Sequence, residues 1–320
     1  MKDSQSILFG DPDVKPNNRI SVKKILHDHQ SYETKARDPD GIIKEAEALG
    51  RKKFYALTSG GKDSITMTNW LAEVGKLECV VHIQTNIGLK MTTDFVKDYC
   101  QEKGWPLKVI EPNPKFVYLT FCLEYGFPGP ELHTMIMSRL KWRTMIAFAK
   151  GAGKDHCLVS GVRKFESNRR MKNYMMPIQK NSGMWFCAPF FYKTNEEIYK
   201  EYIANNLKIS PAYKLGFNTS GECLCGSFAK RYDKDIIRKH DPHLTDYINT
   251  IEHLIQKFGT AHARQYGKWG GYAKMSDMQK QKTVADFFTR NPELAESEQT
   301  EGFICGQECG PGTLRGETDF

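Results

Sequence analysis

The residues 54–64 constrain the fold of this chain more than any other stretch. A short apolar run, Phe54–Leu57, is followed by Ser59-Gly60-Gly61-Lys62-Asp63-Ser64, and an apolar-periodic helix is expected from about Ile65. A strand, a glycine turn and a helix start in this order place backbone N–H groups and the positive end of a helix dipole at one point. The sequence therefore predicts an anion site at this turn, with phosphate as the expected ligand.

Each residue type in the turn suits a phosphate. Gly60 and Gly61 permit a positive φ and a close approach of the ligand to the backbone. Lys62 supplies a point charge, and Ser59 and Ser64 supply hydroxyl donors. The pattern is not a Walker A motif, which requires four residues between its first glycine and its Gly-Lys pair. The alternative is a structural glycine turn with an incidental lysine, but six consecutive suitable residues favour the phosphate site.

The hexapeptide resembles the PP-loop of the ATP pyrophosphatase superfamily. That resemblance implies that the loop holds the β,γ-pyrophosphate of ATP, and that the bond between the α and β phosphates is cleaved. Asp63 would orient the loop or Mg²⁺ rather than act as a base, and Mg²⁺ would offset charge on the leaving pyrophosphate. Lys62 and Asp63 are accordingly predicted catalytic residues, and the predicted ATP-binding residues of the loop are Ser59, Gly60, Gly61, Lys62, Asp63 and Ser64.

Composition narrows the class of protein. A chain of 320 residues with 40% hydrophobic and 26% charged residues is typical of a soluble globular protein, and no apolar run has the length of a membrane span. The first residues, Met1–Ser6, lack the apolar core of a signal peptide, so we expect a cytoplasmic protein. A net charge of +8 suits a polyanionic partner, either a nucleotide or a nucleic acid.

Strands and helices are expected to alternate along most of the chain. We predict an N-terminal extension over 1–40, a nucleotide-binding domain over 41–220 and a basic, cysteine-bearing region over 221–320. The expected strands after the loop are 78–84, 107–111 and 157–160, and the expected helices include 41–49, 92–103, 131–150 and 194–206. The last of these helices is expected to be capped at Thr194, with Glu197 three residues further on. This alternation predicts an α/β fold with a doubly wound parallel sheet, whose ligands bind at the carboxyl ends of the strands.

Three further blocks resemble the phosphoadenylyl-sulfate (PAPS) reductase family within the PP-loop superfamily. They are Gln84–Gly88 with Thr92–Phe95, Ser160–Arg169, and Ile198–Phe217, so the resemblance covers roughly residues 50–230. It implies the fold of an adenine-nucleotide alpha-hydrolase with a cysteine-bearing extension. By the same resemblance, Thr85 and Gly88 line the nucleotide site, and Arg163, which we also take as catalytic, and Arg169 bind anions of the substrate.

The chain departs from the reductase pattern in two places. Reductases usually lack the lysine of the loop, whereas Lys62 is present here and suits ATP as a substrate. The adjacent cysteine pair of the reductases is also missing, and Ser138–Arg143 stands in its approximate place. The chain therefore resembles ATP-using relatives, and is closest in character to iron–sulfur sulfurtransferases such as those of DNA phosphorothioation. Other ATP-using relatives are the ATP sulfurylase small subunits and the tRNA thiolation enzymes.

Two close cysteine pairs suggest a metal centre. Cys223 and Cys225, with Cys305 and Cys309, could supply four thiolates to a [4Fe–4S] cluster or to Zn²⁺. The single residue between Cys223 and Cys225 favours a cluster. The alternatives are unrelated thiols, or a nucleophilic Cys309, because Glu308-Cys309-Gly310 resembles the mobile tail of true reductases. No histidine follows here, which favours a ligand. The remaining cysteines, Cys79, Cys100, Cys122, Cys157 and Cys187, are expected to be small buried hydrophobes.

These observations predict an enzyme of sulfur metabolism that binds ATP, adenylates an acceptor with release of pyrophosphate and supports sulfur transfer. The acceptor could be a nucleic acid, and the stretch 253–282 interleaves cations with aromatic residues as a nucleic-acid surface or an ordinary amphipathic helix would. A cysteine desulfurase or a thioredoxin could donate sulfur or electrons. The alternatives are a PAPS or adenylyl-sulfate reductase that forms sulfite, and a non-catalytic nucleotide-binding subunit.

Overall fold

The structure is a computed structural model that describes residues 38–113, 118–164, 176–230 and 232–271. The predicted N-terminal extension over 1–40 therefore lies almost entirely outside the described residues, as does the C-terminal segment from residue 272. No helix in these four ranges has the length and apolar character that a bilayer crossing requires.

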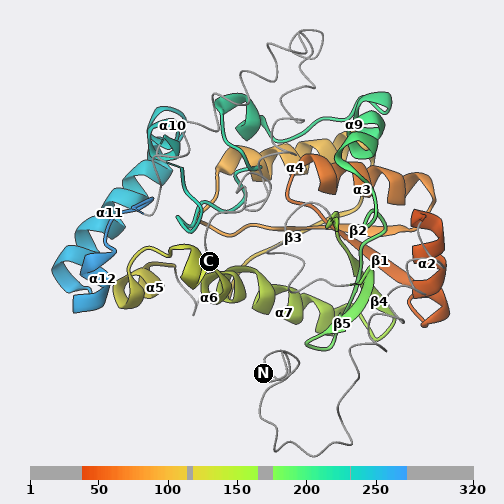
Figure 1. Cartoon of the computed structure of the whole chain (residues 1–320), viewed down its shortest axis with the longest axis horizontal. Helices are drawn as coiled ribbons and strands as arrows, with labels where there is room; N and C mark the ends of the chain where they lie inside the picture. The colour runs from red at the N-terminus through yellow and green to blue at the C-terminus, as the bar shows by residue number, and fades with distance from the viewer. Residues whose placement is uncertain (1–37, 114–117, 165–175, 231, 272–320) are drawn as a thin grey trace, which may run out of the picture. The chain divides into compact units, whose positions relative to one another are not determined.

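A single six-stranded sheet organises the described chain (Figure 1). Its strand order is β3-β2-β1-β4-β6-β5, and every neighbouring pair is parallel except β5 and β6. The predicted α/β fold with a parallel sheet is thus confirmed. The strands are β1 (Lys53–Leu57), β2 (Leu77–Ile83), β3 (Leu107–Ile110), β4 (His156–Val159), β5 (Ile178–Asn181) and β6 (Met184–Cys187).

Helices cover both faces of the sheet, because the strands have apolar side chains on both sides. Figure 1 shows α3 (Lys62–Glu73), α4 (Lys90–Lys103) and α9 (Asn195–Ala204) on one side, with α6 (His133–Met137) and α7 (Arg143–Gly151) on the other. The helix that precedes β1, α2 (Pro39–Ala48), begins at Asp38, whose Oδ1 accepts a hydrogen bond from the backbone N–H of Gly41. The hydroxyl of Thr194 and the carboxylate of Glu197 form a capping box at the start of α9, as the sequence predicts.

Four helices from different parts of the chain share an apolar core beside the sheet. They are α5 (Tyr118–Tyr125), α10 (Asp233–His240), α11 (Pro242–Phe258) and α12 (Ala261–Gln265). Buried side chains of this cluster, among them Phe121, Ile248 and Trp269, share one apolar core with Leu224 and Cys225. The short 3-10 helices η3 (Pro130–Leu132) and η5 (Pro211–Leu215) connect these elements.

The structure differs from the sequence-based expectations in three places. The helix expected over 131–150 is interrupted by η4, a π-helical turn over Ser138–Trp142. The β5–β6 hairpin was not predicted, since only one of the four side chains of β5 is buried and its sequence lacks the apolar run of the other strands. Trp269, an aromatic residue of the stretch 253–282 that could form a nucleic-acid surface or an ordinary amphipathic helix, is 4% exposed and donates its indole N–H to the backbone oxygen of Leu224, so it belongs to the core.

Candidate functional site

The predicted phosphate loop joins the carboxyl end of β1 to the start of α3. Helix α3 begins at Lys62, three residues earlier than expected. Its N-cap residue is Gly61, which has no side chain to accept a hydrogen bond from the first turn. Of the two glycines, Gly60 has a φ of +82°, whereas Gly61 is extended at −83°. The loop thus needs glycine conformational freedom at Gly60, and the first turn of α3 presents its N–H groups and the positive end of its dipole.

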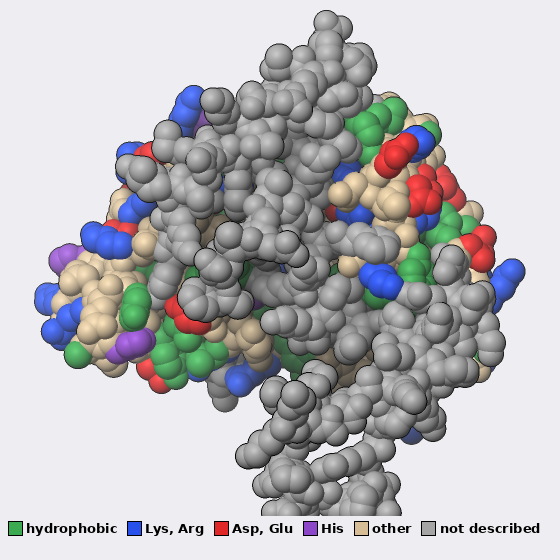
Figure 2. Space-filling view, in the orientation of Figure 1, with side chains coloured by type: hydrophobic (Ala, Val, Ile, Leu, Met, Phe, Trp, Pro, Cys, Tyr) green, Lys and Arg blue, Asp and Glu red, His purple; other side chains and the backbone are tan. Residues whose placement is uncertain are grey.

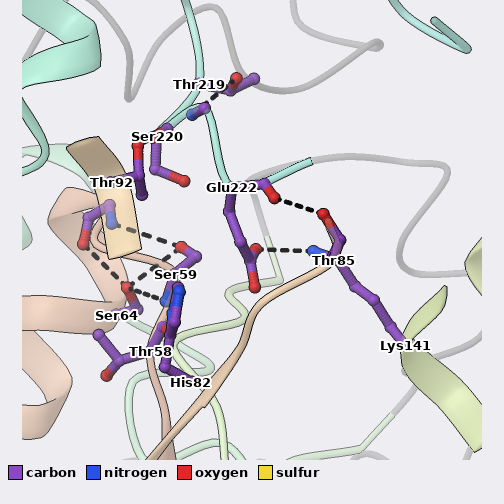
Figure 3. A network of polar contacts seen from close by, with 12 residues as sticks. Thr58, Ser59, Ser64, His82, Thr85, Thr92, Lys141, Thr219, Ser220 and Glu222 are labelled. Carbon is purple, nitrogen blue, oxygen red and sulfur yellow. Dashed lines mark hydrogen bonds and ion pairs between the residues drawn. The ribbon is translucent and has the colours of Figure 1, made fainter. Parts of the chain in front are cut away.

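The serines of the loop hold its backbone in place. The Ser64 hydroxyl donates to the backbone oxygen of Gly61 at 2.9 Å and lies 3.4 Å from the Ser59 hydroxyl (Figure 3). The backbone N–H of Ser210 donates to the oxygen of Gly60 at 2.8 Å, which ties the segment after α9 to the loop. The loop is therefore preorganised by the chain itself.

A cavity of about 280 Å³ opens beside this loop at the carboxyl ends of β1, β2 and β4. The structure brings five of the predicted loop residues together in its wall: Ser59, Gly61, Lys62, Asp63 and Ser64. Ser160 and Gly161, which follow β4, and Tyr213 of η5 complete much of the wall. This is the edge of a parallel sheet where ligands are expected to bind.

An ion pair that the sequence did not predict crosses the cavity wall. Lys141 Nζ donates to Glu222 Oε2 at 2.6 Å, and Thr85 Oγ1 donates to the backbone oxygen of Glu222 at 2.7 Å (Figure 3). Burial lowers the pKa of Lys141, but attraction to Glu222 and to the neighbouring cysteines outweighs it, so the pKa is raised. Lys141 lies on the π-helical turn η4, and π turns are frequent at functional sites.

Asp63 is held by the predicted anion-binding arginine. Arg163 is fully buried, its Nε donates to Asp63 Oδ1 at 2.8 Å, and its Nη2 donates to Asn195 Oδ1 at 2.6 Å. Lys62 Nζ lies 3.8 Å from the same oxygen of Asp63. Arg163 is not among the residues that line the cavity, so its placement favours a role in positioning Asp63.

Thr85 and Gly88 lie behind the cavity, against the segment that carries the cysteines. A Cβ atom added to Gly88 would lie 2.1 Å from the backbone oxygen of Glu222, so these two backbones pack as closely as only glycine allows. Neither residue lines the cavity. Their predicted contact with the nucleotide stays a prediction, and Arg169 lies outside the described residues.

Cys223 directly follows Glu222, which lines the cavity, and Cys225 lies two residues further along the chain. The hydrogen bond from Cys223 lowers the pKa of the Cys225 thiol, and hydrogen bonds with His133 and Ser227 act in the same direction. Cys305 and Cys309 lie outside the described residues. Among the residues that the structure describes, no group of three or more His, Cys, Asp or Glu side chains could hold a metal ion. The two described thiols thus offer only half of the predicted ligand set.

The other cysteines behave largely as expected. Cys100, Cys122, Cys157 and Cys187 are buried, and Cys79 is half-buried. Burial raises the pKa of Cys100 to about 12, which keeps this thiol protonated near neutral pH. These side chains belong to the packing of the fold.

The C-terminal helices carry an exposed basic surface. Figure 2 shows Lys, Arg and His side chains over α10–α12, at the left of the view. Exposed members are Arg238, Lys239, His240, His243, His253, Lys257, His262, Arg264 and Lys268. The exposed cations of this surface could contact phosphates. Trp269 is buried, so its indole is not available to stack on a nucleic-acid base.

Residues 53–227 match the family model described as phosphoadenosine phosphosulfate reductase domain. The chain belongs to this family. The match spans more than half of the chain and confirms the resemblance drawn from the sequence motifs. No curated protein matches the chain.

Solved structures with similar folds include three adenine-nucleotide enzymes at low identity. The PAPS reductase of Candida auris, solved as a phosphate complex, is 15% identical with a TM-score of 0.43, covering 62% of this chain and 94% of its own. The FMN adenylyltransferase of Candida glabrata is 14% identical with a TM-score of 0.40, covering 79% and 91%. The NH3-dependent NAD synthetase of Campylobacter jejuni is 17% identical with a TM-score of 0.39, covering 74% and 95%.

Proposed function

We propose that this protein is an ATP pyrophosphatase-type enzyme that adenylates an acceptor, releases pyrophosphate and supports sulfur transfer. The observation that carries the proposal is the loop Ser59–Ser64, which presents the start of α3 and Lys62 to the cavity at the carboxyl ends of the strands. In this proposal Ser59, Gly60, Gly61, Lys62 and Ser64 bind the pyrophosphate moiety of ATP.

The donors around the cavity fit magnesium. Asp63 and Glu222 are the carboxylates in its wall, and Mg²⁺ at nucleotide sites commonly takes one or two carboxylates together with substrate phosphates. When bound, the ion would offset the charge of the leaving pyrophosphate. Arg163 would hold the carboxylate of Asp63 at the first turn of α3. There the carboxylate could either bind magnesium or orient the loop.

A metal centre would lie beside the adenylation site. Cys223 and Cys225 fit a cluster or zinc as two thiol ligands, and Cys305 with Cys309 would have to supply the others. The backbone of the first pair is anchored on three sides: Leu224 N–H donates to Ile87, Tyr118 donates to the oxygen of Cys225, and Trp269 donates to that of Leu224. Such anchoring suits a fixed ligand pair.

Pyrophosphate release from ATP by anaerobically purified protein tests the proposal. We expect release that Lys62→Ala abolishes and that Lys97→Ala, an exposed lysine of α4, leaves unchanged. The same preparation should show the broad visible absorbance of an iron–sulfur cluster. Loss of that absorbance in Cys223→Ser but not in Cys100→Ser would assign the cluster to the predicted pair.

Membership of the reductase-domain family favours one second candidate, the reduction of PAPS or adenylyl sulfate to sulfite. Thioredoxin-dependent sulfite release without pyrophosphate release from ATP would establish this alternative and overturn the first proposal. Retained ATP binding with neither product would instead indicate a non-catalytic nucleotide-binding subunit. Nucleic acid is the first acceptor to assay, because the net charge is +8 and the C-terminal helices carry an exposed basic surface.

A further inference from the structure

A second cavity lies at the amino ends of the strands, whereas the phosphate loop lies at their carboxyl ends. We call it the basal cavity, and its volume is about 440 Å³. It is lined by Arg51, which precedes β1, by His156, the first residue of β4, and by the β5–β6 hairpin. Because parallel strands run in one direction, the amino ends of β1 and β4 place this cavity away from the adenylation site.

The basal cavity is strongly cationic. Arg51, Lys150, Lys154 and Lys180 line it, and no Asp or Glu is among its lining residues in the described chain. The indole of Trp185 fixes two of these charges, with Arg51 Cζ 5.0 Å and Lys180 Nζ 5.9 Å from its ring centroid. Arg51 also donates from Nε to the oxygen of Leu49 at 3.1 Å, so its guanidinium is held in place.

A buried histidine completes the wall and points to a ligand. His156 is 6% exposed, and its Nδ1 lies 2.5 Å from the backbone oxygen of Gly153. A carbonyl can only accept, so Nδ1 carries a hydrogen, and in that tautomer of the imidazole Nε2 is an acceptor. Nε2 is buried and has no hydrogen-bond partner among the described residues. A buried polar atom without a partner costs free energy that a ligand hydroxyl would recover.

The lining of the basal cavity therefore suits three chemical groups that one ligand could carry. Its four cations call for a polyanion such as phosphate, His156 Nε2 calls for a hydroxyl donor, and the apolar Ile146 and Met184 leave a wall for a nucleobase. Its volume lies within the range of about 300–1,000 Å³ of small-ligand sites. We propose that the basal cavity binds a ribonucleotide unit, either as a free nucleotide or as part of an RNA strand.

The two sources are distinguished by parallel titrations with AMP and with a short oligoadenylate RNA. The test variant is Lys150→Gln/Lys154→Gln. The matched control is Lys44→Gln/Lys97→Gln, which removes the same charge from exposed positions of α2 and α4. Any AMP bound at the phosphate loop is common to both variants, and pyrophosphate release should be unchanged in both, so the proposed function is tested separately.

We expect about tenfold weaker binding of one ligand to the test variant and wild-type affinity in the control. For RNA, loss of two phosphate contacts should also reduce the slope of log affinity against log salt by about 1.4. An effect on AMP alone assigns a free nucleotide, and an effect on RNA assigns a strand. Equal affinities of the two variants for both ligands overturn the proposal.

The hydroxyl contact has its own test. His156→Phe should weaken AMP binding yet leave the affinity for 2′,3′-dideoxyadenosine monophosphate unchanged, because that analogue has no ribose hydroxyl to donate. If the wild-type protein binds the two nucleotides equally, the assignment of a ribonucleotide is wrong. That comparison uses the wild-type protein alone, so it decides the assignment even if His156→Phe fails to fold.

Discussion

The pair formed by Arg163 and Asp63 gives the sharpest prediction for the proposed adenylation site. Arg163→Met removes a fully buried guanidinium whose Nε lies 2.8 Å from Asp63 Oδ1, while keeping an unbranched side chain in its place. At an effective dielectric constant of about 20, two unit charges at that distance attract by about 6 kcal/mol. Removing one partner of a buried pair costs about 3–5 kcal/mol of stability, because the other charge stays buried.

The cost should fall near the lower end of that range. The Asp63 side chain is 22% exposed, so water screens part of its charge, and Lys62 Nζ lies 3.8 Å from the same oxygen. We therefore expect Arg163→Met to lower the free energy of unfolding by about 3 kcal/mol. Asn195→Ala, which removes only the partner of Nη2, is the matched control and should cost about 1 kcal/mol.

Urea unfolding of a double-mutant cycle measures the pair itself. The cycle compares Arg163→Met, Asp63→Asn and the double variant, and we expect a coupling energy of about 2 kcal/mol. A coupling energy below about 0.5 kcal/mol would refute the reasoning, since the two side chains would then act independently. If Arg163 positions Asp63, Arg163→Met should also lower the rate of pyrophosphate release more than it weakens ATP binding.

Three further predictions concern stability. Gly88→Ala should cost about 3 kcal/mol in thermal unfolding, because its Cβ would lie 2.1 Å from the backbone oxygen of Glu222, whereas Gly151→Ala meets no atom within 4 Å and should be tolerated. Burial raises the pKa of Glu252, but hydrogen bonds from Lys234, Lys268 and Trp269 N–H outweigh it and lower the pKa. Its stabilisation should therefore be present above about pH 4.3 and be lost as pH falls through the lowered pKa, and Glu252→Gln should flatten that acid limb of the stability profile. Thr194→Ala removes the capping box of α9 and should cost about 1 kcal/mol by chemical denaturation, with no change in pyrophosphate release.

The sequence by itself determined the fold class and the place of the strand, glycine turn and helix at Ser59–Ser64. The order of strand, Ser59–Ser64 and helix is a local pattern, and local geometry is what a short stretch of chain specifies. The alternation of strands and helices then required a parallel sheet, and with it the edge where a ligand binds. The capping box at Thr194 is local in the same sense, and it was found for the same reason.

Only the tertiary structure decided which distant residues meet. Lys141 and Glu222 are 81 positions apart, and Arg163 reaches Asp63 across 100 positions, so no local pattern could report either contact. The π-helical turn that carries Lys141 and the packing that buries Trp269 likewise depend on neighbours from other elements. The same holds for the basal cavity, whose cations come from the ends of different elements that only the closed sheet brings together.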